Sequence, residues 1–327
     1  MAEPPTREVL ADADNIALGV GSPALEGEAL PPFRPVPAPA GAWRWRWGLG
    51  LAAWTLFVAG CYVWSDGHLN PYLSLTGFFV GFLVGLTGMG GGALMTPILI
   101  LFFGFPPTMA IGTDVTYAAA TKVFGSWKHW RQGSVDVPLA LWLAAGSVPA
   151  TLLGVGAVNY LKNNHSELID GVLYRAIGAA LMAIGVLLIV KVVMHIDRTH
   201  RRENLTLSPA TKAMTVALGA TAGFAIGLTS VGSGTFLGVF LILLYPLTTD
   251  RIVGTDVFHA TILLLVASIA HIGSGNVDLW MVSALLMGSL PGVLIGAQLT
   301  VHAPSRALRA VLALVLFLSG LALFTRM

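Results

Sequence analysis

The chain has 327 residues, of which 55% are hydrophobic and only 10% are charged. Ordinary globular chains carry about 25% charged residues, so this composition excludes a soluble enzyme, a nucleic-acid-binding protein and a disordered scaffold. It indicates a protein of the lipid bilayer. The single cysteine, Cys61, excludes an intramolecular disulfide and a cysteine-based metal cluster.

Two parts precede the main apolar region. Residues 1–42 hold six of the sixteen acidic residues and a run of prolines without apolar periodicity, which is typical of a disordered tail. Residues 43–71 begin with three tryptophans alternating with two arginines and continue with a short apolar run, which predicts an extra N-terminal transmembrane anchor. A cleaved signal peptide is the alternative, but the long preceding tail favours an uncleaved anchor.

Eight apolar segments follow and form two sets of four. They cover residues 72–104, 108–127, 138–161, 172–194, 212–245, 252–273, 279–301 and 306–324. Gly77 matches Gly219, and the same offset of 142 residues continues without a gap through Gly154 and Gly296. We therefore predict an all-α membrane protein with a first transmembrane repeat at 72–194, a basic cytoplasmic loop at 195–210 and a second repeat at 211–327.

The first segment of each repeat is too long for one straight span. Residues 72–104 would form a helix of about 50 Å, whereas the hydrocarbon core is about 30 Å thick. Glycines in its middle predict a broken or re-entrant helix, because glycine is a poor helix former. With hairpins in both repeats and a cytoplasmic N-terminus, most basic residues fall on the cytoplasmic side. This distribution favours inverted repeats in a cell (inner) membrane; parallel repeats are the alternative.

The two glycine-rich breaks are the first candidate site. Free N–H groups at helix starts, together with hydroxyls, bind anions. We expect the breaks to meet at mid-membrane and to bind the substrate through Thr87, Gly88, Gly90, Gly91, Gly92, Thr229, Ser230, Gly232, Ser233 and Gly234. Close packing between helices is the alternative for any of these glycines. We assign packing to the glycines spaced by four residues, namely Gly77, Gly81, Gly85, Gly219, Gly223 and Gly227.

Polar residues inside the second and sixth segments are the second candidate site. A carboxylate within a bilayer is costly, so it usually faces a cavity, pairs with a cation or binds a proton. We expect an ion pathway, coupled to protons, that uses Thr113, Asp114, Lys122, Thr255, Asp256 and His259. The alternatives are helix capping by the two aspartates, snorkelling of the lysine and local hydrogen bonding of the histidine. We expect His129 and His271 to be interface residues.

Motifs of soluble enzymes are missing from the sequence. We find no HExxH motif, Walker loop or GxSxG elbow, and we predict neither catalysis nor a cofactor nor a metal site. An intramembrane enzyme using Ser233 is the competing hypothesis, although position 91 in the other repeat is glycine. Loss of turnover with intact binding in Ser233→Ala would favour the enzyme.

The combined motifs resemble the TauE/SafE family of sulfite exporters over about residues 72 to 325. The resemblance rests on the run from Gly85 to Gly92 followed by Pro97, on Gly112-Thr113-Asp114 with Lys122, and on the counterparts in the second repeat. It implies an anion permease that exports sulfite, sulfonates or similar anions with the proton gradient. The two aspartates stand where many members have serine, which leaves transport of another small anion or a metal cation as alternatives. A homodimer is also possible on this resemblance.

Overall fold

The computed structural model describes residues 54–56, 58–63, 65, 69–87, 92–193, 208–232, 234, 236–299 and 305–326. Residues 56–327 form one compact unit. The predicted tail at 1–42 and most of the predicted loop at 195–210 lie outside the described residues. Of the predicted anchor, residues 54–56 and 58–63 are described and are helical.

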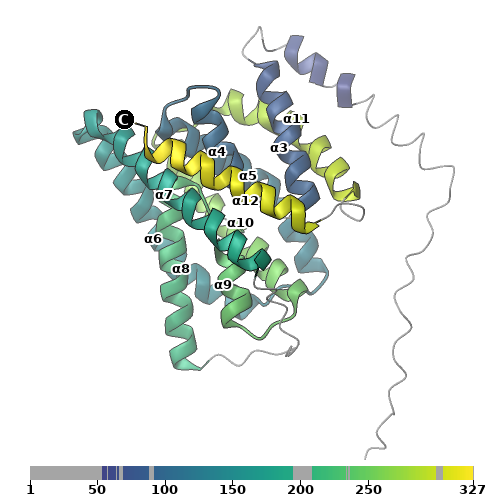
Figure 1. Cartoon of the computed structure of the whole chain (residues 1–327), viewed down its shortest axis with the longest axis vertical. Helices are drawn as coiled ribbons and strands as arrows, with labels where there is room; N and C mark the ends of the chain where they lie inside the picture. The colour runs from purple at the N-terminus through teal and green to yellow at the C-terminus, as the bar shows by residue number, and fades with distance from the viewer. Residues whose placement is uncertain are drawn as a thin grey trace, which may run out of the picture. The chain divides into compact units, whose positions relative to one another are not determined.

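Every regular element of the described residues is a helix, as the sequence predicts (Figure 1). The helices are α3 (Pro71–Thr87), α4 (Gly92–Leu101), α5 (Pro107–Arg131), α6 (Val137–Asn164), α7 (Ser166–Val193), α8 (Pro209–Thr229), α9 (Phe236–Leu244), α10 (Thr249–Gly273), α11 (Leu279–Leu299) and α12 (Ser305–Phe324). Caps define several helix starts. The side chain of Asp136 accepts a hydrogen bond from the backbone N–H of Leu139 at the start of α6, and Ser208 does the same for Thr211 at the start of α8.

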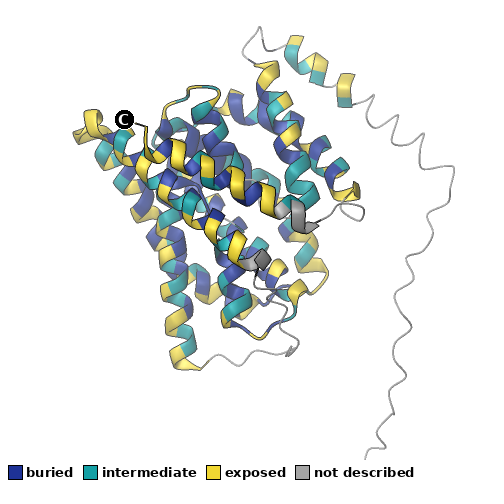
Figure 2. Cartoon of the chain, viewed as in Figure 1, coloured by how far each residue is buried: buried dark blue, intermediate teal, exposed yellow. Residues whose placement is uncertain are grey.

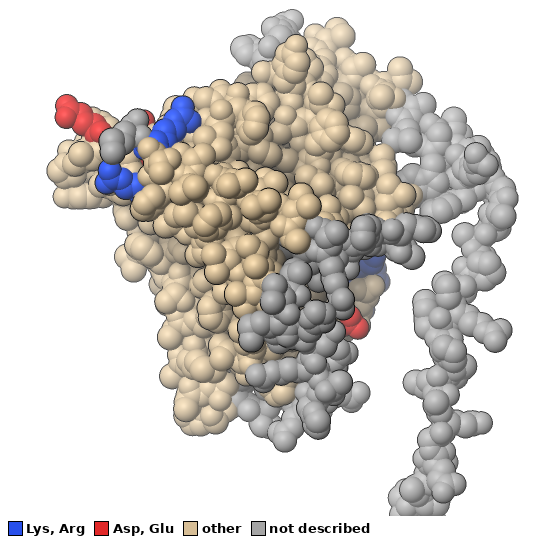
Figure 3. All heavy atoms as spheres, in the orientation of Figure 1, with Lys and Arg blue, Asp and Glu red and all other residues tan. Residues whose placement is uncertain are grey.

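The helices have the length and surface of membrane spans. Five of them, α6, α7, α8, α10 and α11, are long and apolar enough to cross a bilayer. Exposed residues along the outer sides of the helices include many large hydrophobic side chains (Figure 2). The face in Figure 3 carries few charged residues among its described residues, and these lie toward its edges. The prediction of a multi-pass, all-helical membrane protein is confirmed.

The predicted break divides the first segment of each repeat into two helices. α3 ends at Thr87 before α4 begins, and α8 ends at Thr229 before α9 begins. At the second break, Ser230 has a φ of 61° and Gly232 a φ of 115°. These are left-handed conformations that an α-helix cannot contain, and glycine adopts them without steric cost. The helix therefore ends because the backbone turns back.

Glycines bring helices of the two halves into close contact. A β-carbon on Gly81 of α3 would lie 2.5 Å from the carbonyl oxygen of Ser289 in α11. The equivalent residue, Gly223 of α8, faces the backbone of Ser147 in α6 in the same way. Each half thus packs its first helix, α3 or α8, against the fourth helix, α11 or α6, of the other half. The predicted packing role of the glycines spaced by four is confirmed.

Equivalent helices also pack directly against each other. Along α5 and α10, Thr116 contacts Ser268, Thr261 contacts the backbone of Lys122, and a β-carbon on Gly125 would contact Val257. The residue numbers rise on one helix as they fall on the other, so α5 and α10 are antiparallel. α12 lies along α7 in Figure 1, where Gly178 and Gly320 face each other's backbone.

The broken segments return to the end of the molecule from which they start. The hydroxyl of Tyr245, which follows α9, is 2.6 Å from the hydroxyl of Thr215 near the start of α8. In the other half, Ser74 in α3 donates to the carbonyl of Ala284 near the start of α11. The residue before α11, Asp278, donates its backbone N–H to Thr113 near the start of α5, which directly follows α4. Both broken segments therefore form hairpins.

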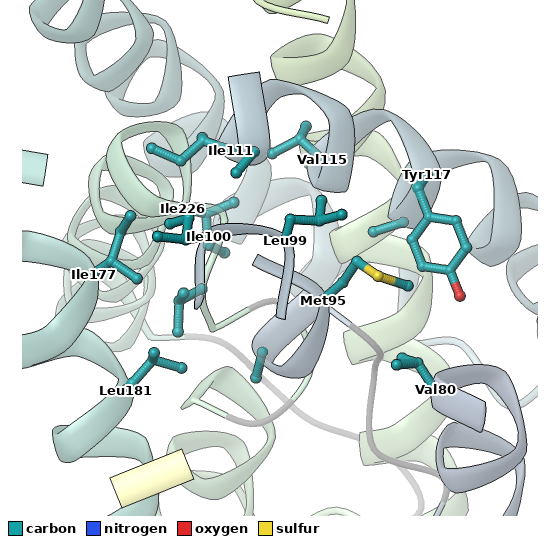
Figure 4. Packing of buried hydrophobic residues seen from close by; sticks show 14 of the residues in the cluster. Val80, Met95, Leu99, Ile100, Ile111, Val115, Tyr117, Ile177, Leu181 and Ile226 are labelled. Atoms are coloured by element: carbon teal, nitrogen blue, oxygen red, sulfur yellow. The ribbon is translucent and has the colours of Figure 1, made fainter. Parts of the chain in front are cut away.

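The short helix α4 lies inside the largest apolar cluster. Figure 4 shows Met95, Leu99 and Ile100 of α4 surrounded by Val80 of α3, Ile177 of α7 and other buried residues. Met95, Leu99 and Ile100 are fully buried. Because most residues of α4 are buried in this cluster, the cluster fixes the position of Thr96, the polar side chain that α4 carries.

Candidate functional site

Asp114 of α5 joins segments from both halves. Its side chain is fully buried, and its Oδ2 atom accepts hydrogen bonds from the hydroxyl of Thr96 in α4 and, at 2.9 Å, from the hydroxyl of Ser230 in the α8–α9 break. Its Oδ1 atom is buried without a hydrogen-bond partner among the described residues. The structure therefore places one carboxyl group between the short helix of the first half and the break of the second half.

Asp256 of α10 occupies the equivalent position in the second half, with a different neighbour. A β-carbon on Gly238 of α9 would lie 3.4 Å from the Oδ2 atom of Asp256. Gly238 is the repeat equivalent of Thr96, so the hydroxyl that faces Asp114 is replaced by a hydrogen atom here. Neither aspartate caps its helix, because the N-caps of α5 and α10 are Pro106 and Thr248. The capping alternative is wrong.

The two threonines of the Gly-Thr-Asp motifs connect the halves. Thr255 accepts a hydrogen bond of 2.8 Å from the backbone N–H of Asp136, and Thr113 accepts one of 3.2 Å from that of Asp278. Both threonines are fully buried. Each hydroxyl holds the start of a long helix of the other half, so these predicted pathway residues act here as links between α5 or α10 and its neighbour.

Lys122 and His259 lie in the same buried region between α5 and α10. Lys122 is only 9% exposed and interacts electrostatically with Asp256, Asp114 and His259. The His259 Nε2 atom is 2.8 Å from the hydroxyl of Ser147, while its Nδ1 atom is buried without a partner in the described part of the chain. A buried imidazole with one open nitrogen can accept or donate one more hydrogen bond.

Part of the predicted glycine-rich site is described. The hydroxyl of Thr87 donates to the carbonyl of Leu83, and that of Thr229 donates to the carbonyl of Ala225, so both hydrogens are used within their own helices. Gly92 begins α4, while Gly232 and Gly234 lie in the second break with positive φ. Four predicted residues lie outside the described residues, namely Gly88, Gly90, Gly91 and Ser233.

The second break does not lie at the middle of the α5–α10 pair. Ser230 contacts Asp114, which is only two turns from the start of α5. The helix α8, with 21 residues, is about 31 Å long, which brings its end beside the start of α5. The depth of the two breaks in the membrane stays a prediction.

Sequence reasoning missed Thr96 and Ser147 and misjudged His271. Thr96 is a single hydroxyl in an apolar stretch, and the repeat hides it because its equivalent is Gly238. His271, predicted at the interface, is fully buried next to the backbone of Gly227, whereas the equivalent His129 is half-buried and bonded to Ser134. No group of three or more metal-binding side chains occurs in the part of the chain that the structure describes.

Several membrane-spanning helices, two broken hairpins and charged side chains buried between them define a membrane transporter. The model of the sulfite exporter TauE/SafE family matches residues 73–323. The chain therefore belongs to the TauE/SafE family. This confirms the resemblance found in the sequence.

Curated relatives come from bacteria and an archaeon. The chain is 39% identical over 257 residues to the probable membrane transporter protein YjnA of Bacillus subtilis, an alignment that covers 78% of this chain and 100% of YjnA. It is 25% identical over 246 residues to YdhB of the same organism, covering 75% and 96% of the two chains. It is 27% identical over 172 residues to MJ0441 of Methanocaldococcus jannaschii, covering 51% and 59%. No solved structure matches the chain.

Proposed function

We propose that the protein is a secondary transporter that exports a small sulfur-containing anion, such as sulfite or a sulfonate, and that transport of the anion is coupled to protons. The observation that carries the proposal is the position of Asp114 between Thr96 and Ser230. A titratable group that bridges the broken segments of both halves can respond to a solute bound at either segment. Asp256 and His259 complete the set of groups that would carry protons.

Hydrogen-bond donors support an anionic substrate. The start of α4 at Gly92 has N–H groups without partners inside the helix. Helix starts attract anions through these N–H groups and through the helix dipole. Lys122 adds a positive charge in the same region. A sulfur oxyanion has several acceptor oxygens that such donors can bind.

The charges of the buried region support coupling to protons. Asp114, Asp256 and Lys122 together carry a formal charge of −1 when all three are ionised. Adding an anion to a buried region that is already negative is unfavourable, because a low dielectric strengthens repulsion. Binding a proton at one of the carboxyl groups removes that repulsion. Anion binding and proton binding should therefore favour each other.

The contacts support inverted repeats. α5 and its equivalent α10 are antiparallel, as the contacts of Thr116 with Ser268 and of Lys122 with Thr261 indicate. Two equivalent helices that are antiparallel enter a membrane from opposite sides. Each hairpin begins and ends at one end of the molecule, so a hairpin and three spans per half give an odd number of crossings. This is the arrangement expected for alternating access.

Basic residues support a cytoplasmic N-terminus in a cell (inner) membrane. The end of the molecule where α5 finishes and α8 and α10 begin carries Lys128, Arg131, Lys212 and Arg251. The sequence that joins the end of α7 to the start of α8 contains Arg198, Arg201 and Arg202. The opposite end carries Lys162, Arg175 and Arg326. The positive-inside rule assigns the first end to the cytoplasm.

Flux of radiolabelled sulfite into proteoliposomes tests this function. We expect uptake well above that of empty liposomes, and we expect an imposed pH gradient to accelerate it. Asp114→Asn should retain the shape of the site but abolish the acceleration by the gradient, because an amide cannot exchange a proton. Efficient flux of a metal cation, with no flux of sulfite, thiosulfate or taurine, would contradict the proposal.

A further inference from the structure

Lys122 lies close to the point where the two halves cross. Its backbone carbonyl is 3.3 Å from the hydroxyl of Thr261 on the antiparallel helix α10. Its own repeat equivalent is Leu264, less than one turn from Thr261. Lys122 of α5 therefore lies beside the part of α10 that contains its equivalent residue, Leu264. A lysine here is a single positive charge at the centre of an otherwise repeated arrangement.

The two carboxyl groups lie on opposite sides of this crossing point. Asp114 precedes Lys122 by eight residues, which places it about 12 Å away along α5. Asp256 precedes Thr261 by five residues, about 8 Å along α10 and in the opposite direction because the helices are antiparallel. Lys122 interacts electrostatically with both carboxyl groups. Along the helix axes, Asp256 is the nearer of the two.

A lysine side chain can reach toward either carboxyl group. Its ammonium group extends about 6 Å from the Cα atom on a flexible stem. The carboxyl group of an aspartate and one hydrogen bond span a further several ångströms. In the present conformation Asp114 instead accepts hydrogen bonds from Thr96 and Ser230. The hydroxyl groups of Thr96 and Ser230 therefore bind the carboxylate that is farther from Lys122 along the helix axes.

We propose that Lys122 is a counter-ion shared by two carboxyl groups, pairing with Asp256 in one conformation of the transporter and with Asp114 in the other. This inference rests on the proposed function. The change of partner by Lys122 is the switch that would couple the Asp114 side of the crossing point to the Asp256 side. The carboxyl group that Lys122 leaves binds a proton, since an unpaired buried carboxylate is costly, and the carboxyl group that Lys122 joins releases its proton, so the number of bound protons stays the same during the switch. The ammonium group carries the bound anion past the crossing point as it changes partner.

The internal repeat provides an unusual control for this switch. Leu264 is the equivalent of Lys122, so a lysine at 264 would lie eight residues after Asp256, as Lys122 lies eight residues after Asp114. The double variant Lys122→Leu/Leu264→Lys therefore moves the charge without changing the composition of the chain. In this variant the lysine should interact more strongly with Asp114 than with Asp256.

Sulfite flux in proteoliposomes gives the first measurement. Lys122→Leu should lower gradient-driven flux by at least about tenfold, because the two carboxyl groups lose their shared counter-ion. The double variant should recover flux to within about threefold of the unmodified chain, because the charge returns to an equivalent position. Unchanged flux in Lys122→Leu would overturn the proposal. So would a double variant that elutes and melts like the unmodified chain but stays as inactive as Lys122→Leu.

Cysteine accessibility gives a second measurement that needs no substrate. In a Cys61→Ala background, cysteines at the equivalent and exposed positions Val137 and Leu279, the first residues of α6 and α11, report on opposite ends of the molecule. A membrane-impermeant maleimide should label the two positions at unequal rates, and the double variant should reverse which is faster. Equal effects of the double variant on both positions would overturn the switch. Reversed labelling without any sulfite flux would support the switch and refute only the proposed substrate.

Discussion

Replacing Gly81 with alanine tests whether the contact between α3 and α11 holds the two halves together. The new β-carbon would lie 2.5 Å from the carbonyl oxygen and 2.7 Å from the Cα atom of Ser289. Ordinary carbon contacts are about 3.5–4.0 Å, so the helices must separate by roughly 1 Å. Both clashing atoms belong to a backbone and cannot rotate away. Overpacking of this kind costs about 1–3 kcal/mol.

Gly156 of α6 provides the matched control, because a β-carbon there meets nothing within 4 Å. Thermal unfolding in detergent should show a melting temperature several degrees lower for Gly81→Ala, since each kcal/mol shifts it by about 2–4 °C in a chain of 150–250 residues. Gly156→Ala should leave the melting temperature unchanged or raise it, because alanine is the better helix former. If both variants melted alike, the close approach of α3 and α11 would not be a source of stability.

Three other variants test contacts near the ends and in the site. Thr96→Val removes a hydroxyl donor from Asp114 and should lower the free energy of unfolding by about 1–3 kcal/mol, as measured by chemical denaturation; no change would mean that Ser230 alone satisfies the carboxyl group. Arg251→Met breaks an ion pair of 3.7 Å with Asp136, and the arginine side chain is 27% exposed, so the loss should be about 0–1 kcal/mol and smaller in high salt. A larger loss of free energy of unfolding would show that this ion pair stabilises the contact between the starts of α6 and α10. Burial raises the pKa of Tyr245, so the unfolded chain releases the phenolic proton first and stability should fall as the pH rises above about 10. Tyr245→Phe should reduce that fall in melting temperature.

The arrangement of the helices could largely be predicted because the sequence contains two similar repeats. The match of Gly77 with Gly219 identifies the repeat, and the excessive length of 72–104 predicts the break before α4. The spacing of Gly81 and its neighbours predicts close packing. These signals are local or periodic, so they can be recognised without knowing which helices pack against each other.

Partners across the halves could not be predicted in the same way. Ser230 bonds to Asp114 only because α8 extends far enough to bring its end beside the start of α5. Thr96 is absent from the repeat pattern, since position 238 is glycine. His271 follows Ser268 by one turn near the end of α10, and its position at the end of a predicted span indicated an interface residue. Tertiary contacts decide all three cases, and they join residues as close as 18 positions (Thr96 with Asp114) and as far apart as 116 positions (Ser230 with Asp114).

The packing of the first helix of one half against a helix of the other half also affects the order in which contacts can form during synthesis. α3 is translated long before α11, whose first residue, Leu279, comes 192 positions after the end of α3 at Thr87. At about 5–20 residues per second, the ribosome needs roughly 10–40 seconds to make the intervening chain. During that time the face of α3 that carries Gly77, Gly81 and Gly85 cannot yet pack against α11. A nascent chain truncated after the first repeat should therefore be a target for membrane quality-control proteases.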